Sequence, residues 1–283
     1  MKKFTLLIVL FTTCIFANIN AIVSILPQKT FVQAIGGDKV DVALMVQPGN
    51  SPHTYEPKPS QMIEITKADL YFAIDVEFEN VWLPKFQSLN QKMKVIDLAD
   101  NIHKIDMGDA QCEHDHDDHG DKGADPHIWT SPKNVKIMAK HIFEALSAVD
   151  ISNTAYYKDN LNTFLQEIEE TDTRIKEILA SVKKDNKFMV FHPSWGYFAK
   201  AYHLKQIAVE VEGKEPKPKE LIDLLKEAKE ERVKAIFTQP EFSDTVAHII
   251  AKELKIPVVK VSPLAADWSQ NLINIAKTIA GKK

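Results

Sequence analysis

The chain has 283 residues, of which 45% are apolar and 26% are charged. This composition is typical of a globular protein with one large or two medium domains, and it excludes wholesale disorder. The formal net charge of −4 comes without a basic stripe, which argues against nucleic acid as a partner.

The N-terminal residues are typical of a secretory signal peptide. Lys2 and Lys3 precede an apolar run from Phe4 to Ala17, and small or polar residues continue to Ala21. This run is shorter than the about 20 apolar residues that span a bilayer. We therefore predict a signal peptide over residues 1–21, cleaved after Ala17 or Ala21, and a soluble periplasmic protein.

The two cysteines agree with this compartment. Cys14 lies inside the signal peptide, so Cys112 is alone in the mature chain and no internal disulfide can form. The three residues before Cys14 begin with a bulky Phe, which matches a lipoprotein cleavage site poorly. We therefore expect a protein that is free in the periplasm and not anchored through a lipid.

In the first half of the mature chain, short β-branched runs alternate with helical patterns. Such alternation predicts a parallel sheet flanked by helices, which we assign to an N-terminal α/β lobe over residues 22–151. The predicted strands are 21–26, 40–46, 70–75 and 94–98, and the predicted helices are 30–35, 61–68 and 80–89, with Ser60 as an N-cap.

A long helical pattern follows this lobe. From Asn153 to Val182, apolar residues recur at helical spacing without Gly or Pro, and Ser152 or Asn153 is available as an N-cap. About 30 residues at 1.5 Å each form a rod of roughly 45 Å, long enough to run along two lobes. We interpret residues 152–184 as a rigid connecting helix; the alternative is a long surface helix of one domain.

The second half repeats the alternation of strands and helices. The predicted strands are 187–192, 206–211, 234–239 and 258–261, and the predicted helices are 194–203, 218–231, 244–254 and 268–280. We assign residues 185–283 to a C-terminal α/β lobe. The predicted fold is therefore α/β, with two lobes that each contain a parallel sheet flanked by helices, joined by one long rigid helix.

Three histidines lie where predicted strands end or helices begin. His53 follows a strand, His127 precedes a helix, and His192 closes a strand, each with a proline beside it. Open parallel sheets bind ligands at the carboxyl ends of their strands, so these side chains can converge on one crevice. Imidazole nitrogens are good ligands for tetrahedral zinc. Taken singly, each histidine is explained equally well as a helix cap or a buried structural group.

The residues around these histidines resemble known motifs. They are Pro-Gly-Asn-Ser-Pro-His-Thr-Tyr-Glu-Pro at 48–57, Asp-Pro-His-Ile-Trp at 125–129 and Phe-His-Pro-Ser-Trp-Gly-Tyr-Phe at 191–198. With them, nearly the whole mature chain resembles the solute-binding proteins of transition-metal ABC transporters, and it is similar in particular to the zinc-uptake type. The resemblance implies that His53, His127 and His192 bind zinc as a transported ligand and that a membrane permease is the partner.

The resemblance leaves the fourth ligand open. Relatives use a C-terminal aspartate, a glutamate or a water, and Asp267 is the candidate here, although its motif is offset from the aspartate of manganese-type relatives. The alternative is that Asp267 caps the last helix, because aspartate is a favoured N-cap. Manganese-type relatives carry a carboxylate where this chain has His192, and exchanging that oxygen ligand for imidazole shifts the preference toward zinc.

One acidic, histidine-rich stretch has no helical or strand periodicity. Residues 111–124 contain His114, His116 and His119 and are predicted to form a mobile loop, which relatives also carry before the second ligand motif. These histidines can act as auxiliary ligands that catch zinc and pass it on. The alternative is a solvated acidic loop that binds metal only weakly.

We therefore predict a monomeric, periplasmic, high-affinity zinc-binding protein that delivers zinc to an ABC-type permease for import and is not an enzyme. A competing hypothesis is a secreted zinc hydrolase or lyase, because three histidines leave a coordination position for a reactive water. The chain has no His-Glu-x-x-His motif and no evident base beside a ligand, which argues against that hypothesis. A manganese-type binding protein and a surface adhesin are two further candidates.

Overall fold

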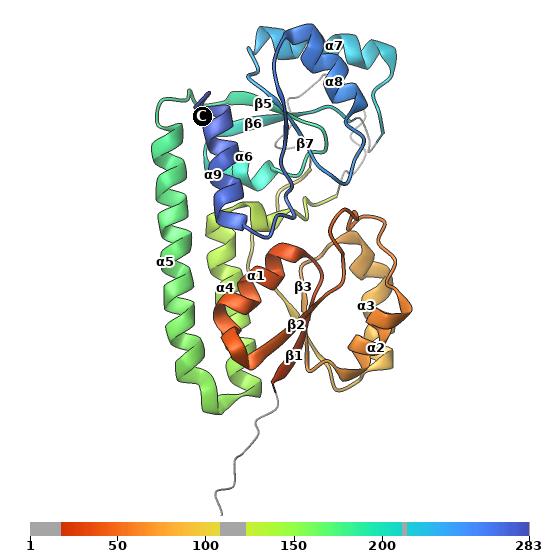
Figure 1. The fold of residues 1–283 in the computed structure, drawn as a ribbon, viewed down its shortest axis with the longest axis vertical. Coiled ribbons are helices and arrows are strands. Elements are labelled where there is room, and N and C mark those ends of the chain that lie inside the picture. The colour runs from red at the N-terminus through yellow and green to blue at the C-terminus, as the bar shows by residue number, and fades with distance from the viewer. Residues whose placement is uncertain (1–17, 108–122, 211–213, 283) are drawn as a thin grey trace, which may run out of the picture.

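The computed structural model describes residues 18–107, 123–210 and 214–282. Within them the chain forms two α/β lobes, one above the other, with a layer of long helices along one side (Figure 1). Most of the predicted signal peptide and nearly all of the histidine-rich stretch lie outside the described residues.

The N-terminal lobe contains a parallel sheet with the strand order β2-β1-β3-β4. The central strands are almost entirely buried because helices cover both faces of the sheet. The strands are β1 (Ile19–Val23), β2 (Val40–Leu44), β3 (Leu70–Ala73) and β4 (Lys94–Asp97). The helices are α1 (Leu26–Gly36), α2 (Pro59–Lys67), α3 (Glu77–Leu89) and α4 (Pro132–Val149).

The C-terminal lobe repeats this topology with the strand order β6-β5-β7-β8. Its strands are β5 (Asn186–Val190), β6 (Leu204–Ala208), β7 (Ile236–Thr238) and β8 (Val258–Lys260). Its helices are α6 (Gly196–Ala201), α7 (Pro218–Glu230), α8 (Thr245–Leu254) and α9 (Trp268–Ile279). In each sheet the strand order reverses between the first and third strands, which is where such sheets bind ligands.

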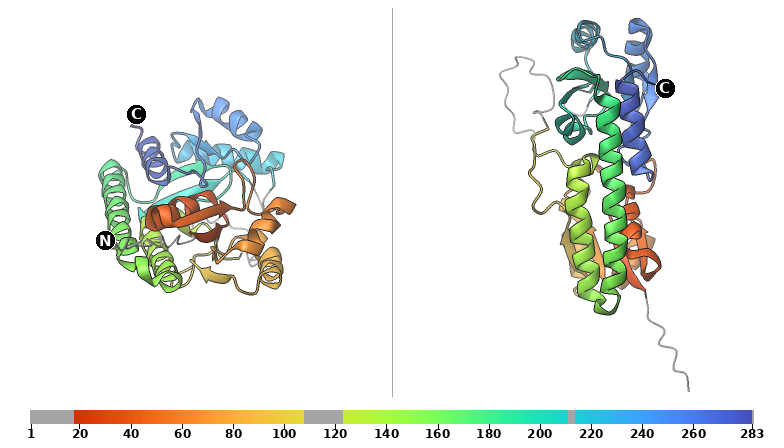
Figure 2. Two further views of the ribbon diagram at one scale, coloured as in Figure 1. Left: turned by 60° about the horizontal axis from the view of Figure 1, so that its bottom comes forward. Right: turned by 90° about the vertical axis from the view of Figure 1, so that its left-hand side faces the viewer.

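Helix α5 (Thr154–Leu179) connects the lobes, as predicted. It packs against α1 and α4 of the N-terminal lobe and against α9 of the C-terminal lobe (Figure 2). One apolar cluster therefore continues from the first sheet through α5 to α9. The helix has 26 residues, shorter than the predicted range 153–182, and at 1.5 Å per residue it is about 39 Å long.

Two predicted helix starts were wrong, and the predicted cap of α5 is correct in position but not in its hydrogen bonds. Asn153 occupies the N-cap position of α5, but its side chain accepts no hydrogen bond from the helix. The side chains of Asn153 and Ser152 instead donate to the carboxylate of Asp150. Ser60 lies inside α2, which starts one residue earlier, because Pro at the first helical position has a fixed φ that suits a helix. The predicted strand 21–26 ends at Val23, and α1 starts at Leu26 for the same reason, with a proline in its first turn.

Buried hydrogen bonds join the lobes behind the site. Trp129 Nε1 donates to the carbonyl oxygen of Pro263, and Trp268 Nε1 donates to that of Trp129, both at 2.7 Å. The Tyr197 hydroxyl donates to the carbonyl oxygen of Asp125 at 3.1 Å. Because buried polar groups are costly when unpaired, these bonds resist separation of the lobes at this point.

Candidate metal centre

The site lies between the lobes, at the carboxyl ends of their strands. Loops that follow β2, β4, β5, β7 and β8 line one cavity of about 10 Å³, with room for a single ion or water. His53 comes from the loop after β2, His127 from the segment after β4, and His192 from the loop after β5. Parallel-strand topology therefore brings together side chains that are far apart in the sequence.

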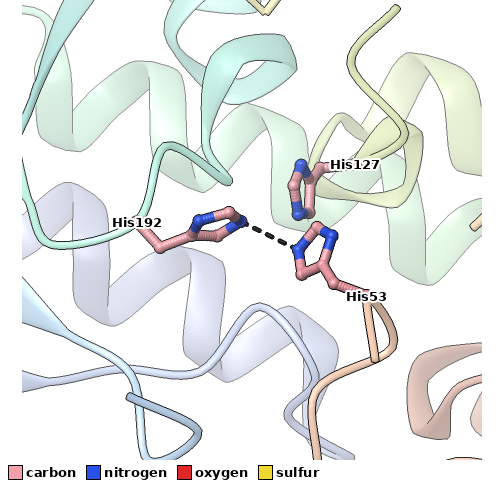
Figure 3. Close-up of side chains that lie close together, drawn as sticks. All are labelled: His53, His127 and His192. Carbon is pink, nitrogen blue, oxygen red and sulfur yellow. Dashed lines mark hydrogen bonds between the residues drawn. The ribbon is translucent and has the colours of Figure 1, made fainter. Parts of the chain in front are cut away.

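The three histidines point their rings toward one another (Figure 3). His53 Nε2 and His192 Nε2 lie 3.0 Å apart, and one ligand nitrogen from each of the three lies within 4.8 Å of the others. A tetrahedral zinc with bonds of about 2.0–2.1 Å requires nitrogens roughly 3.3 Å apart. Small rotations of these rings are therefore sufficient for them to bind one ion.

Each histidine uses its other ring nitrogen to donate to a carboxylate. This arrangement fixes the tautomer, so that Nε2 carries a lone pair toward the centre, and it raises the basicity of the ligand. The pairs are His53 with Glu77 Oε1 at 2.8 Å, His127 with Asp125 Oδ1 at 2.7 Å and His192 with Glu210 Oε1 at 2.7 Å.

The pKa values of two groups in the site, His192 and Glu77, differ from their usual values. Burial lowers the pKa of His192 and outweighs the hydrogen bond to Glu210, which acts in the opposite direction. Burial also acts to raise the pKa of Glu77, but the hydrogen bond and charge of His53 outweigh it, so that this pKa lies below its usual value. Metal ions bind the neutral form of histidine, so the lowered pKa of His192 favours metal binding.

Local contacts hold the buried histidines in place. Asp125 Oδ1 accepts a second hydrogen bond from the backbone N–H of His127 at 2.8 Å. The Gln239 side chain accepts from His192 N at 3.3 Å and donates to His192 O at 2.9 Å. The Phe242 ring stacks on the His192 ring with centroids 4.8 Å apart. The backbone and the ring of His192 are therefore both fixed from the loop after β7.

Asp267 lies outside the histidine cluster. It is exposed and caps α9, where its Oδ1 accepts from Gln270 N at 3.1 Å. Among the described residues, the groups placed to hold an ion together are His53, His127 and His192. The auxiliary candidates His114, His116 and His119 belong to the part of the chain that the structure does not describe.

Four carboxylates at the site were not predicted from the sequence. Three of them, Glu77, Asp125 and Glu210, hold the histidines, and the fourth, Glu241, lines the cavity. Asp125 lies two residues before His127 in the Asp-Pro-His motif, so its role had a local signal. The others follow different strands, and only the folded topology brings them to the site.

This fold and this cluster define a two-lobed α/β binding protein with a candidate metal centre between its lobes. Residues 22–281 match the model of the family described as ZnuA, zinc-uptake complex component A, periplasmic, so the chain belongs to this family. Its members are solute-binding proteins of ABC transporters, which work with a membrane permease, and not enzymes. The predicted family, the two-lobed fold and the absence of an enzymatic role are thereby confirmed.

Individual relatives agree with this assignment. A crystal structure of ZnuA is 41% identical, with a TM-score of 0.85 over 94% of this chain and 99% of that one. A zinc-bound ZnuA with residues 138–173 deleted is 42% identical, with a TM-score of 0.84 over 93% of this chain and 97% of that one.

Two curated relatives are more distant. The zinc-binding lipoprotein AdcA of Streptococcus pneumoniae is 27% identical over 87% of this chain, which spans about half (50%) of AdcA. A putative metal-binding protein of Chlamydia muridarum is 28% identical over 92% of this chain and 90% of its own length. Across the described residues, no helix has both the length and the apolarity to cross a bilayer.

Proposed function

We propose that this protein binds one zinc ion through the Nε2 atoms of His53, His127 and His192 and delivers it to the permease of an ABC transporter. The observation that supports this most directly is the convergence of three imidazoles, each with a carboxylate behind it. A set of nitrogen ligands suits zinc, whereas manganese prefers carboxylate and water oxygens. The names of ZnuA and AdcA support the same metal.

We further propose that a water molecule, and not Asp267, occupies the fourth position. The Asp267 carboxylate caps α9, so moving it to the ion would leave a backbone N–H of that helix unsatisfied.

The decisive experiment compares zinc binding by the mature protein with that of His53→Ala, His127→Ala and His192→Ala, measured by competition with a chelator. The mature protein should bind one zinc tightly, and each variant should lose tight binding while keeping its fold. His248→Ala, which alters an exposed histidine on α8, is the matched control and should bind like the parent. Unchanged tight binding in the three single variants would contradict the site, and tighter binding of manganese than zinc would contradict the cargo.

We also propose that the protein acts in the periplasm as a monomer after cleavage following Ala17. β1 begins at Ile19, which pairs with Val40, so cleavage after Ala21 would remove part of a central strand. N-terminal sequencing of the exported protein tests this, and an N-terminus at Ile22 would refute it.

His114, His116 and His119 remain proposed auxiliary ligands. Deleting residues 111–122 should remove weak additional zinc binding and leave one tight site, because three closely spaced histidines must lose conformational entropy before they chelate. Zinc titration of the deletion variant measures both classes of site. Loss of the tight site on deletion would mean that this stretch supplies a ligand to the central ion.

A further inference from the structure

A fourth acidic residue, Glu241, lines the cavity of the three histidines. Glu241 is half-buried and follows β7, on the opposite side of the C-terminal sheet's switch point from Glu210. Among the described residues that line this cavity, it is the one ionisable group besides the histidines. The carboxylates of Glu77, Asp125 and Glu210 each bond one histidine. Within the described chain, the carboxylate of Glu241 makes no hydrogen bond to a histidine of the site.

The position of Glu241 is coupled to His192. Gln239, two positions before Glu241, bonds both the backbone N–H and the carbonyl oxygen of His192. Phe242, the residue after Glu241, stacks on the imidazole ring of His192. Because Gln239 and Phe242 both contact His192, the backbone of Glu241 between them cannot shift relative to His192 without breaking these contacts.

The carboxylate is also oriented by a serine. Ser262 Oγ accepts from the backbone N–H of Leu264 at 3.0 Å, which directs its own proton to Glu241 Oε1 at 3.1 Å. Within the described part of the chain, Ser262 is the one side chain that bonds this carboxylate, and it uses Oε1. The second oxygen, Oε2, makes no side-chain hydrogen bond among the described residues.

Glu241 is not close enough to the histidines to share an ion with them directly. The described residues that can hold one ion together are the three histidines, and Glu241 is not among them. A zinc–oxygen bond is about 2.0–2.2 Å, and a charged hydrogen bond between oxygens is about 2.5–2.7 Å. A carboxylate at that combined distance contacts the ion through one water.

We propose that Glu241 accepts a hydrogen bond from the water on the fourth coordination position of the bound zinc, and that it excludes anions from this position. The inference rests on the proposed three-histidine zinc site. In this role Glu241 is a positioning residue: it holds the water that is the fourth ligand and so increases the affinity of the site for zinc. Its negative charge disfavours any anionic replacement for the water.

The test compares the mature protein with Glu241→Gln, which keeps an oxygen acceptor for Ser262 and removes only the charge. The matched control is Glu167→Gln, which removes a charge from α5, away from the cavity. Zinc affinity is measured by chelator competition. Azide affinity is measured from the visible spectrum of the cobalt-substituted protein, because this spectrum reports the number and type of ligands.

Glu241→Gln should bind zinc 10- to 100-fold more weakly, as is typical when a partner of a metal ligand is removed. It should bind azide several-fold more tightly, a change that a merely structural role would not produce. Zinc and azide affinities equal to those of Glu167→Gln would overturn the inference. A cobalt spectrum that loses a ligand in Glu241→Gln without azide would also overturn it, because Glu241 would then bind the ion directly. If the unaltered protein binds no zinc at its histidines, the proposed function itself fails.

Discussion

The carboxylates behind the histidines should contribute measurably to zinc affinity, and Asp125 offers the clearest test. Its side chain is 1% exposed, and Oδ1 accepts from both the N–H and Nδ1 of His127, at 2.8 and 2.7 Å. Asp125→Asn keeps an oxygen for both bonds and removes the charge. Charge-assisted bonds are roughly twice as strong as neutral ones, and losing such a partner costs about 10- to 100-fold in metal affinity. That loss corresponds to about 1.4–2.7 kcal/mol.

The assay is competition between the protein and a zinc chelator at fixed pH and salt, with thermal unfolding of the metal-free forms to check folding. Asp223→Asn is the control, because it removes the same charge from an exposed position on α7. The expected result is a weaker zinc complex for Asp125→Asn alone, with similar melting of all metal-free forms. If the zinc affinities of Asp125→Asn and Asp223→Asn agree within twofold, the carboxylate does not tune its histidine, and the argument from Nδ1 geometry is wrong.

Three further predictions concern pH, packing and movement. Burial raises the pKa of Glu79 from 4.5 to about 7, so between these values the folded chain holds a proton that the unfolded chain releases. The unfolding free energy should therefore fall by about 3 kcal/mol as pH rises through this window, and denaturant unfolding of Glu79→Gln at pH 5 and 8 should show a smaller fall. Phe164→Ala should cost about 3–5 kcal/mol in unfolding free energy, because the buried ring lies between α5 and the N-terminal lobe; a cost below 1 kcal/mol would show that α5 packs loosely. Labels at the exposed positions Ile63 on α2 and Ile222 on α7 should keep their separation when zinc binds, because α5 contains no Pro or Gly. A shortening of several ångströms would instead require a hinge in this helix.

The strands of the described residues were predictable because each is a short run with apolar residues that lies between turn residues. Their ends were not, since periodicity does not show where ladder hydrogen bonds stop. The strand predicted at 21–26 illustrates this, because its last residue starts α1 instead. The connecting helix was predicted from its apolar spacing, but its caps were not. Asp150 accepts the side-chain bonds of Ser152 and Asn153, and residue preference alone does not reveal such competition.

The convergence of His53, His127 and His192 was predicted from their places at strand ends, and the structure brings them together. The partners Glu77 and Glu210 lie far from their histidines in the chain and in no special motif, so no local signal pointed to them. Glu77 and Glu210 follow β3 and β6, and the parallel pairing of these strands with β1 and β5 places both residues beside the site. Aspartate is common both as a helix N-cap and as a metal ligand, so residue type alone could not show the role of Asp267. In the structure its contacts are those of an N-cap.

The inter-lobe origin of the site has a consequence for how the protein matures. His53 and His192 are 139 residues apart in sequence, and the bonds of Trp129 and Trp268 that hold the lobes together also connect distant segments. Contacts of such long range form late, because loop closure costs conformational entropy before they can stabilise the chain. A chain whose lobes have not yet docked therefore lacks the complete set of three histidines that we propose as the zinc site. If zinc binds at the proposed site, it stabilises only the chain in which both lobes have folded and docked, so metal capture would act as a checkpoint on assembly.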